Sequence, residues 1–269
     1  MDFIHTIGHA KQKELFERAM KNGRMGHAYA FVGPANVGKT TFALDLASAL
    51  GADPIQDVII AEELSTDSIR RSQARLNLTP VGRLKVMIVP QAEAMTPAVG
   101  NLILKTLEEP PPHSLIILLT ENYYGLLPTV VSRVQRVNLF PLSKVDMARA
   151  IERFSLPAEK AEAIVKLAAG RPGLARRLAE ETELLGFYDS ANRLLPLIYA
   201  GDSLSRLRAA DELSKSEEQQ LKIFLTCAMS DWVNRPHHEP AIAGKLLAAW
   251  RDLRYHLNKK LVLDNLFLP

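Results

Sequence analysis

The segment Gly33-Pro34-Ala35-Asn36-Val37-Gly38-Lys39-Thr40 matches the pattern G-x-x-x-x-G-K-[ST]. An apolar run at 28–32 precedes it, and a helical pattern begins at Lys39, which is the context that this pattern requires. The glycines let the backbone wrap around phosphate groups with its N–H groups pointing inward, and the start of the helix adds positive potential. In such a loop Lys39 reaches the β- and γ-phosphates, and the Thr40 hydroxyl ligates Mg²⁺. The segment therefore predicts a site for ATP or ADP with Mg²⁺, made by Gly33, Gly38, Lys39, Thr40 and Thr41.

Outward from this loop, the first half of the chain alternates short apolar runs with helical patterns. A strand followed by a helix, repeated along the chain, is typical of a mostly parallel sheet with helices on both faces. We therefore predict an α/β fold here. The expected strands are 28–32, 58–61, 85–89, 115–119 and 137–139, and the expected helices are 11–21, 39–50, 68–76 and 98–107.

After Leu139 the strand signal ends and only helical patterns follow, at 143–154, 158–168 and 174–181 and then in longer stretches from Glu183 onward. Apolar residues repeat there at the spacing of one helical face, so we expect them in a core. Three domains follow from this division: a nucleotide-binding domain at 1–140, a small helical domain at 141–182 and a C-terminal helical domain at 183–269. The expected core positions are Leu184, Phe187, Tyr188, Ala191, Leu194, Leu195, Ile198, Leu221, Phe224, Leu225, Ala228, Met229, Trp232, Leu246, Leu247, Trp250, Leu253 and Leu257.

Composition excludes several classes of protein. The single cysteine, Cys227, excludes an intrachain disulfide and a cysteine-based zinc site, and we expect it to be buried in a helix. The seven histidines show no metal-binding spacing. The longest apolar runs, such as 115–119, are too short to span a membrane, and 1–8 does not have the pattern of a signal peptide. We expect a cytoplasmic protein without a zinc site.

The acidic residues that a hydrolysing loop of this kind usually needs are missing. They would follow the strand at 85–89, where this chain has Pro90 and Gln91. Glu93 lies beyond the strand end and is expected to be a solvated charge at the start of a helix. Loss of one preorganised charge-stabilising group typically costs about 10²–10³ in rate, and two are missing here. The chain is therefore expected to bind nucleotide at most, and to hydrolyse it poorly or not at all.

Several longer motifs carry a family resemblance that covers residues 4–181. They are His27-Ala28-Tyr29-Ala30-Phe31, Leu104-Lys105-Thr106-Leu107-Glu108-Glu109-Pro110-Pro111-Pro112-His113, and Thr120-Glu121-Asn122 followed by Leu126-Leu127-Pro128-Thr129-Val130-Val131-Ser132-Arg133. In these motifs the sequence resembles the gamma and delta-prime AAA+ subunits of the clamp loader of bacterial DNA polymerase III. The resemblance implies an AAA+ P-loop domain, a helical lid domain and an all-α C-terminal collar that joins subunits into a ring.

The resemblance also implies roles for individual residues. Ser132-Arg133 matches the family's Ser-Arg-Cys motif, with Val134 in place of the cysteine, so Arg133 would be an arginine finger that acts in trans on the ATP site of an adjacent subunit. A plain salt-bridging arginine is the alternative. Thr120 would be a sensor near the γ-phosphate, or simply a strand-end threonine that satisfies a turn. Ile4 and Ile7-Gly8 precede the first helix, where the family packs the adenine base.

Three departures from the family pattern favour a delta-prime-like chain over the motor subunit. The acidic pair is replaced by Pro90-Gln91, Gly173 stands where the gamma subunits have a second sensor arginine, and the 51–57 link is too short for the family's four-cysteine zinc insert. The resemblance implies the gamma and delta subunits, the sliding clamp and, through the complex, primed DNA as partners. Arg70, Arg71 and Arg75, on a helix opened by Ser65-Thr66, could form a DNA-facing surface or be solvated charges.

Other functions remain open on the sequence alone. A gamma-like motor that hydrolyses ATP itself is supported by the intact Gly38-Lys39-Thr40, and Pro90-Gln91 counts against it. A small-molecule P-loop kinase would need a substrate pocket and charge-clamping arginines of its own. Other AAA+ proteins, such as repair or recombination factors, complete the alternatives.

Overall fold

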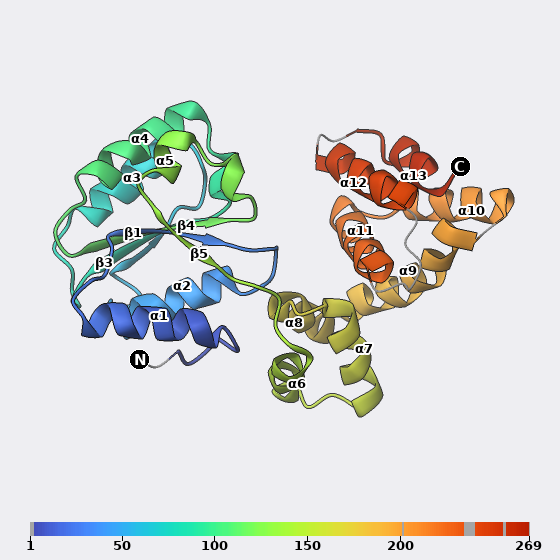
Figure 1. The fold of residues 1–269 in the computed structure, drawn as a ribbon, viewed down its shortest axis with the longest axis horizontal. Coiled ribbons are helices and arrows are strands. Elements are labelled where there is room, and N and C mark those ends of the chain that lie inside the picture. The colour runs from blue at the N-terminus through green and yellow to red at the C-terminus, as the bar shows by residue number, and fades with distance from the viewer. Residues whose placement is uncertain (1–2, 201, 234–239, 255–256, 269) are drawn as a thin grey trace. The chain divides into compact units, whose positions relative to one another are not determined.

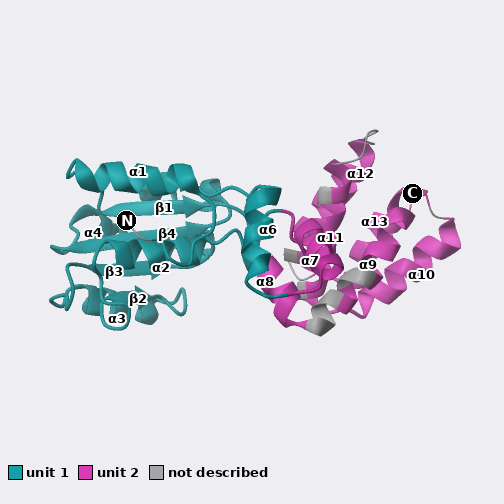
Figure 2. Ribbon diagram, turned by 90° about the horizontal axis from the view of Figure 1, so that it is seen from below, with its two compact units in different colours: residues 1–155, 170–174 teal, residues 156–169, 175–269 magenta. Residues whose placement is uncertain are grey.

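The computed structural model describes residues 3–200, 202–233, 240–254 and 257–268. The chain forms two compact units, which Figure 2 shows in different colours. Unit 1 consists of Met1–Ser155 and Gly170–Leu174, and unit 2 of Leu156–Ala169 and Ala175–Pro269. The expected division into three domains stays a prediction.

Unit 1 is built on a five-stranded sheet in which every pair of neighbours is parallel (Figure 1). The strand order is β2-β3-β4-β1-β5, so β1, which leads into the predicted phosphate loop, lies between β4 and β5. Ala28 pairs with Ile116 of β4 and Tyr29 with Gln135 of β5. This confirms the α/β fold with a parallel sheet. The strands are β1 (Ala28–Val32), β2 (Val58–Ile60), β3 (Lys85–Val89), β4 (Ser114–Thr120) and β5 (Gln135–Asn138).

Helices cover both faces of this sheet. In Figure 1, α1 (Ala10–Lys21) and α2 (Lys39–Ala49) lie on one side, and α3 (Thr66–Leu76), α4 (Pro97–Glu108) and α5 (Pro128–Val131) lie on the other. Side chains alternate between the faces along each strand, so one strand contributes to two cores. Ala28 and Ala30 of β1 belong to the α3–α4 side, whereas Tyr29 and Phe31 pack with Phe16 of α1 and Phe42 of α2. Burial on both faces explains the uninterrupted apolar runs of the central strands.

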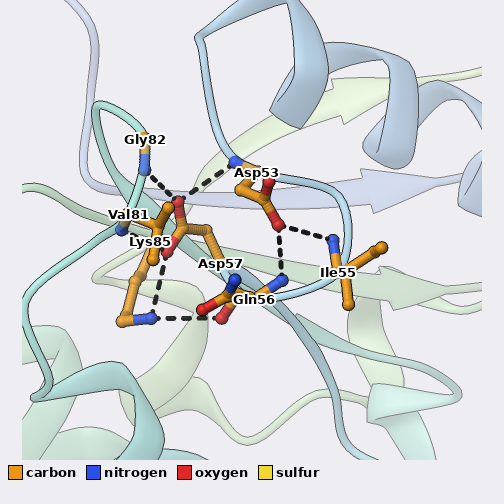
Figure 3. Close-up of polar contacts among 7 residues, drawn as sticks. All are labelled: Asp53, Ile55, Gln56, Asp57, Val81, Gly82 and Lys85. Carbon is orange, nitrogen blue, oxygen red and sulfur yellow. Dashed lines mark hydrogen bonds and ion pairs between the residues drawn. The ribbon is translucent and has the colours of Figure 1, made fainter.

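A buried carboxylate holds together the segments around the edge strand β2 (Figure 3). The Asp57 side chain is fully buried, and its oxygens accept hydrogen bonds from the backbone N–H groups of Asp53, Val81 and Gly82, at 3.0, 2.9 and 2.6 Å. Lys85 Nζ, also buried, lies 3.1 Å from Asp57 Oδ1. Burial alone would raise the pKa of Asp57, but these N–H groups and the ammonium outweigh it and hold the pKa far below its usual value. The ionised carboxylate therefore fixes the turn that enters β3.

The remaining helices are α6 (Lys144–Glu152), α7 (Ala158–Ala168), α8 (Pro172–Glu180), α9 (Thr182–Ala200), α10 (Ser203–Ser214), α11 (Glu218–Val233), α12 (Pro240–Arg254) and α13 (Lys259–Phe267). In unit 2, α13 packs against α9, α10 and α12, and α11 packs against α9 and α12. Short 3₁₀ turns, η1 (Ala92–Ala94) and η2 (Tyr123–Gly125), complete unit 1.

Most of the core positions expected in these helices lie where the apolar stripes placed them. Ala191, Leu221, Phe224 and Leu253 are buried, and so is Cys227 on α11, as predicted. Two expectations are wrong. Leu247 stands at the margin of the apolar stripe of α12 and is 63% exposed, and Leu257 lies beyond the end of α12 at Arg254 and is 49% exposed. The side chains of Leu184 and Tyr188 lie outside the described residues.

In the part of the chain that the structure describes, no helix combines the length and the apolar character needed to cross a membrane. The same residues contain no group of three or more histidine, cysteine or carboxylate side chains arranged to hold a metal ion.

Candidate nucleotide-binding site

The predicted phosphate loop joins the carboxyl end of β1 to the start of α2. Gly33 donates its N–H to Thr120 O at the end of β4, at 3.1 Å. A Cβ atom on Gly33 would lie 2.3 Å from Leu139 O, so only glycine fits where the loop leaves the sheet. Gly38 caps α2 with a φ of 103°, a left-handed conformation that glycine adopts without strain. The two loop glycines are thus required by the backbone path.

Lys39 folds back onto its own loop. Its Nζ donates to Gly33 O at 2.7 Å and to Pro34 O at 2.9 Å. Burial lowers the pKa of Lys39, while the negative charges of Glu121 and Glu93 act in the opposite direction. Thr40 is exposed and Thr41 half-buried in the first turn of α2. A bound phosphate would compete with these two carbonyl oxygens for the ammonium group of Lys39. The side chain is thus held at the loop where the predicted phosphate site lies.

Two other segments of unit 1 contact the backbone of this loop, and neither contact was predicted from the sequence. The Nε2 atom of His9, just before α1, lies 3.1 Å from Val37 O. Burial lowers the pKa of His9, which favours the neutral ring. On the other side, Gly173 donates its N–H to Asn36 O at 3.0 Å. Gly173 is the position where gamma-like chains would have a sensor arginine, so here that position meets the loop with backbone instead of a side chain.

The segment before α1 is held next to α2 by a buried carboxylate. Asp45 Oδ2 on α2 accepts the backbone N–H groups of His5 and Thr6, at 2.9 and 2.6 Å. Ile7, the predicted contact to the base, follows directly and is half-buried, whereas Ile4 is 69% exposed. This holds the residues just before Ile7 against α2, the helix that follows the phosphate loop.

Thr120 stands at the end of β4 and is 1% exposed. Its hydroxyl donates to Asn122 O at 3.0 Å and accepts the N–H of Asn122 at 3.1 Å. The side chain thus satisfies a turn in this structure, while the backbone carbonyl meets Gly33. Its role as a sensor stays a prediction.

The end of β3 carries Pro90 and Gln91, so no carboxylate follows that strand directly. Glu93 stands in the first turn of η1, as predicted, but the expectation that it is solvated is wrong. It is half-buried, and its Oε1 accepts the N–H of Glu121 at 3.0 Å. The sequence could not show this, because the contact joins the ends of two strands that become neighbours only in the folded sheet.

Arg133 lies near the amino ends of the strands, whereas the phosphate loop follows the carboxyl end of β1. It precedes β5 by two residues, and β5 runs parallel to β1 with Tyr29 opposite Gln135 and Val32 opposite Asn138. At about 3.3 Å per strand residue, the loop that follows Val32 is on the order of 15 Å further along the strands. The Arg133 side chain is 36% exposed. Arg133 therefore does not complete the site of its own chain.

The guanidinium of Arg133 makes three contacts within its own chain. One terminal nitrogen, NH1, donates to Thr129 O and to Ser132 Oγ, each at 2.9 Å. The other, NH2, lies 2.6 Å from Glu108 Oε1 at the end of α4. Ser132 Oγ in turn donates to Thr129 O at 3.0 Å. The salt bridge expected as the alternative for this residue exists, but it leaves the side chain at the surface.

Residues 54–143 match the profile of a family described as DNA polymerase III, delta subunit. The DNA polymerase III subunit delta' of Pseudomonas aeruginosa is 30% identical over 199 residues, which are 62% of this chain and 60% of that protein. The DNA polymerase III subunit tau of Bacillus subtilis is 28% identical over 158 residues, which are 50% of this chain and 28% of that protein.

A solved structure of similar fold is the DNA polymerase III gamma subunit-related protein of Thermotoga maritima, with a TM-score of 0.57 and 22% identity over 95% of this chain and 97% of that one. The chain spans less than two thirds of the length of the two curated relatives above. The family match covers β2 to β5 and the Ser-Arg motif, whereas β1 and the phosphate loop precede it. Over part of its length, the chain is therefore similar in sequence to delta and delta' subunits of DNA polymerase III.

Proposed function

We propose that the chain is a delta-prime-like subunit of the DNA polymerase III clamp loader, which helps to load the sliding clamp on primed DNA during replication. In this role it supplies Arg133 in trans to the ATP site of a neighbouring subunit. The gamma and delta subunits, the sliding clamp and primed DNA are its proposed partners. The three proposed domains are the AAA+ domain at 1–140, a lid at 141–182 and a collar at 183–269.

The position of Arg133 is the observation that carries this proposal. The side chain is at the surface, on the order of 15 Å along the strands from the loop of its own chain, and three acceptors hold its guanidinium. A cation in this place can act on a phosphate only if another molecule brings that phosphate to it. An arginine finger of this kind is worth about 10³–10⁵ in rate.

The chain's own loop is proposed to bind ATP or ADP with Mg²⁺ and to hydrolyse it poorly. The loop N–H groups and Lys39 would hold the phosphates, Thr40 would ligate Mg²⁺, and Ile7 and Thr120 would line the site. Mg²⁺ bridges the phosphates and neutralises their charge when nucleotide is bound. The missing acidic pair at Pro90-Gln91 supports weak hydrolysis.

The alternative is a gamma-like motor, and the turnover of the isolated chain separates the two. We expect steady-state ATP hydrolysis by the purified chain to be at background, and the chain to co-purify with gamma, delta and the sliding clamp. Turnover comparable to a competent AAA+ motor would contradict the proposal in favour of the motor, and failure to join the other subunits would contradict both.

A DNA-facing surface is proposed on α3. Arg70, Arg71 and Arg75 are exposed, and Ser65 caps the helix by accepting the N–H of Ser68 at 3.2 Å. Phosphate contacts use helix starts and scattered cations, which this helix offers. Arg70 lies 3.7 Å from Asp67, so Arg71 and Arg75 are the stronger candidates.

A further inference from the structure

Two of the motifs that carry the family resemblance contact each other directly. Glu108 belongs to the Leu-Glu-Glu-Pro-Pro segment and Arg133 to the Ser-Arg segment, and the carboxylate of the first lies 2.6 Å from the guanidinium of the second. We propose that Glu108 is a positioning residue for Arg133, which holds the guanidinium ready for the phosphate of a neighbouring subunit. This inference rests on the proposed function of Arg133.

The packing of α4 fixes the place of Glu108. A Cβ atom on Gly100 would lie 2.1 Å from Leu127 Cδ1, so the glycine lets α4 approach the segment that leads into α5. Glu108 is the last residue of α4, and the prolines that begin at Pro110 prevent the helix from continuing. The carboxyl end of a helix carries partial negative charge. This charge attracts a nearby cation in addition to the attraction exerted by the Glu108 carboxylate.

The number of N–H donors decides whether Glu108 supports the arginine or competes for it. A guanidinium has five N–H donors. Thr129 O and Ser132 Oγ accept hydrogen bonds from NH1, whereas Glu108 Oε1 makes an ion pair with NH2 at 2.6 Å. The Nε–H takes part in none of these contacts. A phosphate can therefore approach the guanidinium at Nε while the ion pair with Glu108 remains.

Preorganisation of the Arg133 side chain predicts that loss of Glu108 lowers ATP turnover. A free arginine side chain loses rotamer freedom when it binds, whereas one already held by three acceptors loses little. Without Glu108, the two contacts of NH1 remain and the guanidinium can still turn about them. Because both side chains are partly exposed, at 36% and 51%, solvent screens the ion pair and its effect is modest.

The test uses the loader reconstituted with gamma, delta and this chain. Glu108→Ala is expected to lower DNA-stimulated ATP turnover about twofold to fivefold, with the KM for ATP and the unfolding temperature of the chain unchanged. Glu108→Gln, which keeps an acceptor oxygen, should fall between Glu108→Ala and the unmodified chain. Glu109→Ala is the matched control, since Glu109 is the exposed next residue, and it should leave turnover unchanged.

The background variant Arg133→Ala separates positioning from a general structural role. In that background, Glu108→Ala should cause no further loss. Two results would overturn the inference while leaving Arg133 in its role. One is that Glu108→Ala lowers turnover by the same factor in the Arg133→Ala background as in the unmodified chain. The other is that Glu108→Ala alone has a turnover equal to or above that of the Glu109→Ala control. If Arg133→Ala itself leaves turnover unchanged, the proposed function fails, and the inference fails with it.

Discussion

Replacement of Asp57 by alanine should strongly destabilise unit 1. The carboxylate is fully buried, and its removal leaves Lys85, which is 5% exposed, without its anionic partner, together with three backbone N–H groups. Removal of one partner from a buried ion pair typically costs about 3–5 kcal/mol, and Lys85 keeps one acceptor in Gln56 O, so we expect about 3 kcal/mol. That is a large part of the roughly 5–15 kcal/mol that stabilises a typical domain.

Urea unfolding measures this loss, and the chain provides an internal control. The two tryptophans, Trp232 and Trp250, both belong to unit 2, so their fluorescence follows unit 2, whereas amide hydrogen exchange in β2 and β3 follows unit 1. In Asp57→Ala we expect the amide protection in β2 and β3 to fall. The urea midpoint of the tryptophan fluorescence transition should shift less than the stability of unit 1 does. The double variant Asp57→Ala/Lys85→Met should recover part of the loss, because it removes the unpaired charge. A change in unit 1 below about 1 kcal/mol would refute the reasoning.

The same network predicts a dependence on pH. Because the pKa of Asp57 is lower in the folded chain than in the unfolded chain, its contribution is fully present above the unfolded value of about 4 and is lost as pH falls below it. Urea unfolding should therefore show a loss of stability below about pH 4 that is smaller in Asp57→Asn, the nearest neutral variant. An equal acid loss in both chains would show that other carboxylates cause it.

Two further predictions concern the phosphate loop. Gly33→Ala should abolish binding of a fluorescent ATP analogue, because the added Cβ would lie 2.3 Å from Leu139 O. The control Gly244→Ala, on α12, has open space around the added Cβ and should bind the analogue normally. Binding by Gly33→Ala at the affinity of the unmodified chain would contradict the fit of the loop. Lys39→Ala should reduce the ATP turnover of the assembled loader less than Arg133→Ala does, because occupancy of this loop is not the chemical step. Equal or greater loss in Lys39→Ala would show that the chain's own site takes part in hydrolysis.

The sheet could be predicted from the sequence because its central strands are buried on both faces. The predicted bounds of β1 and β3 agree with the structure, since every residue in them is buried. At the edge, β5 begins two residues earlier than expected, because Gln135 and Arg136 are exposed and carry no apolar signal. The helix α10 was not predicted, and its Leu204 and Leu207 are exposed, which weakens the apolar stripe that would have marked it.

The position of the phosphate loop could also be predicted from the sequence, because its glycines, lysine and hydroxyl follow one another in the chain. The contacts around it were not, since His9, Gly173 and Glu93 reach it or its neighbours from distant segments and partly through backbone atoms. Glu108 escaped prediction for the same reason: sequence motifs show which residues recur together, and only folding brings α4 against the turn before β5.

The DNA-stimulated ATP turnover of a reconstituted clamp loader carrying Arg133→Ala tests the central claim most directly. The matched control is Arg149→Ala, an arginine 70% exposed on α6. The account predicts that the assembled complex keeps its composition and loses turnover by a factor of about 10³ at sites next to this chain, while the control keeps full activity. Full turnover by the Arg133→Ala complex would contradict it.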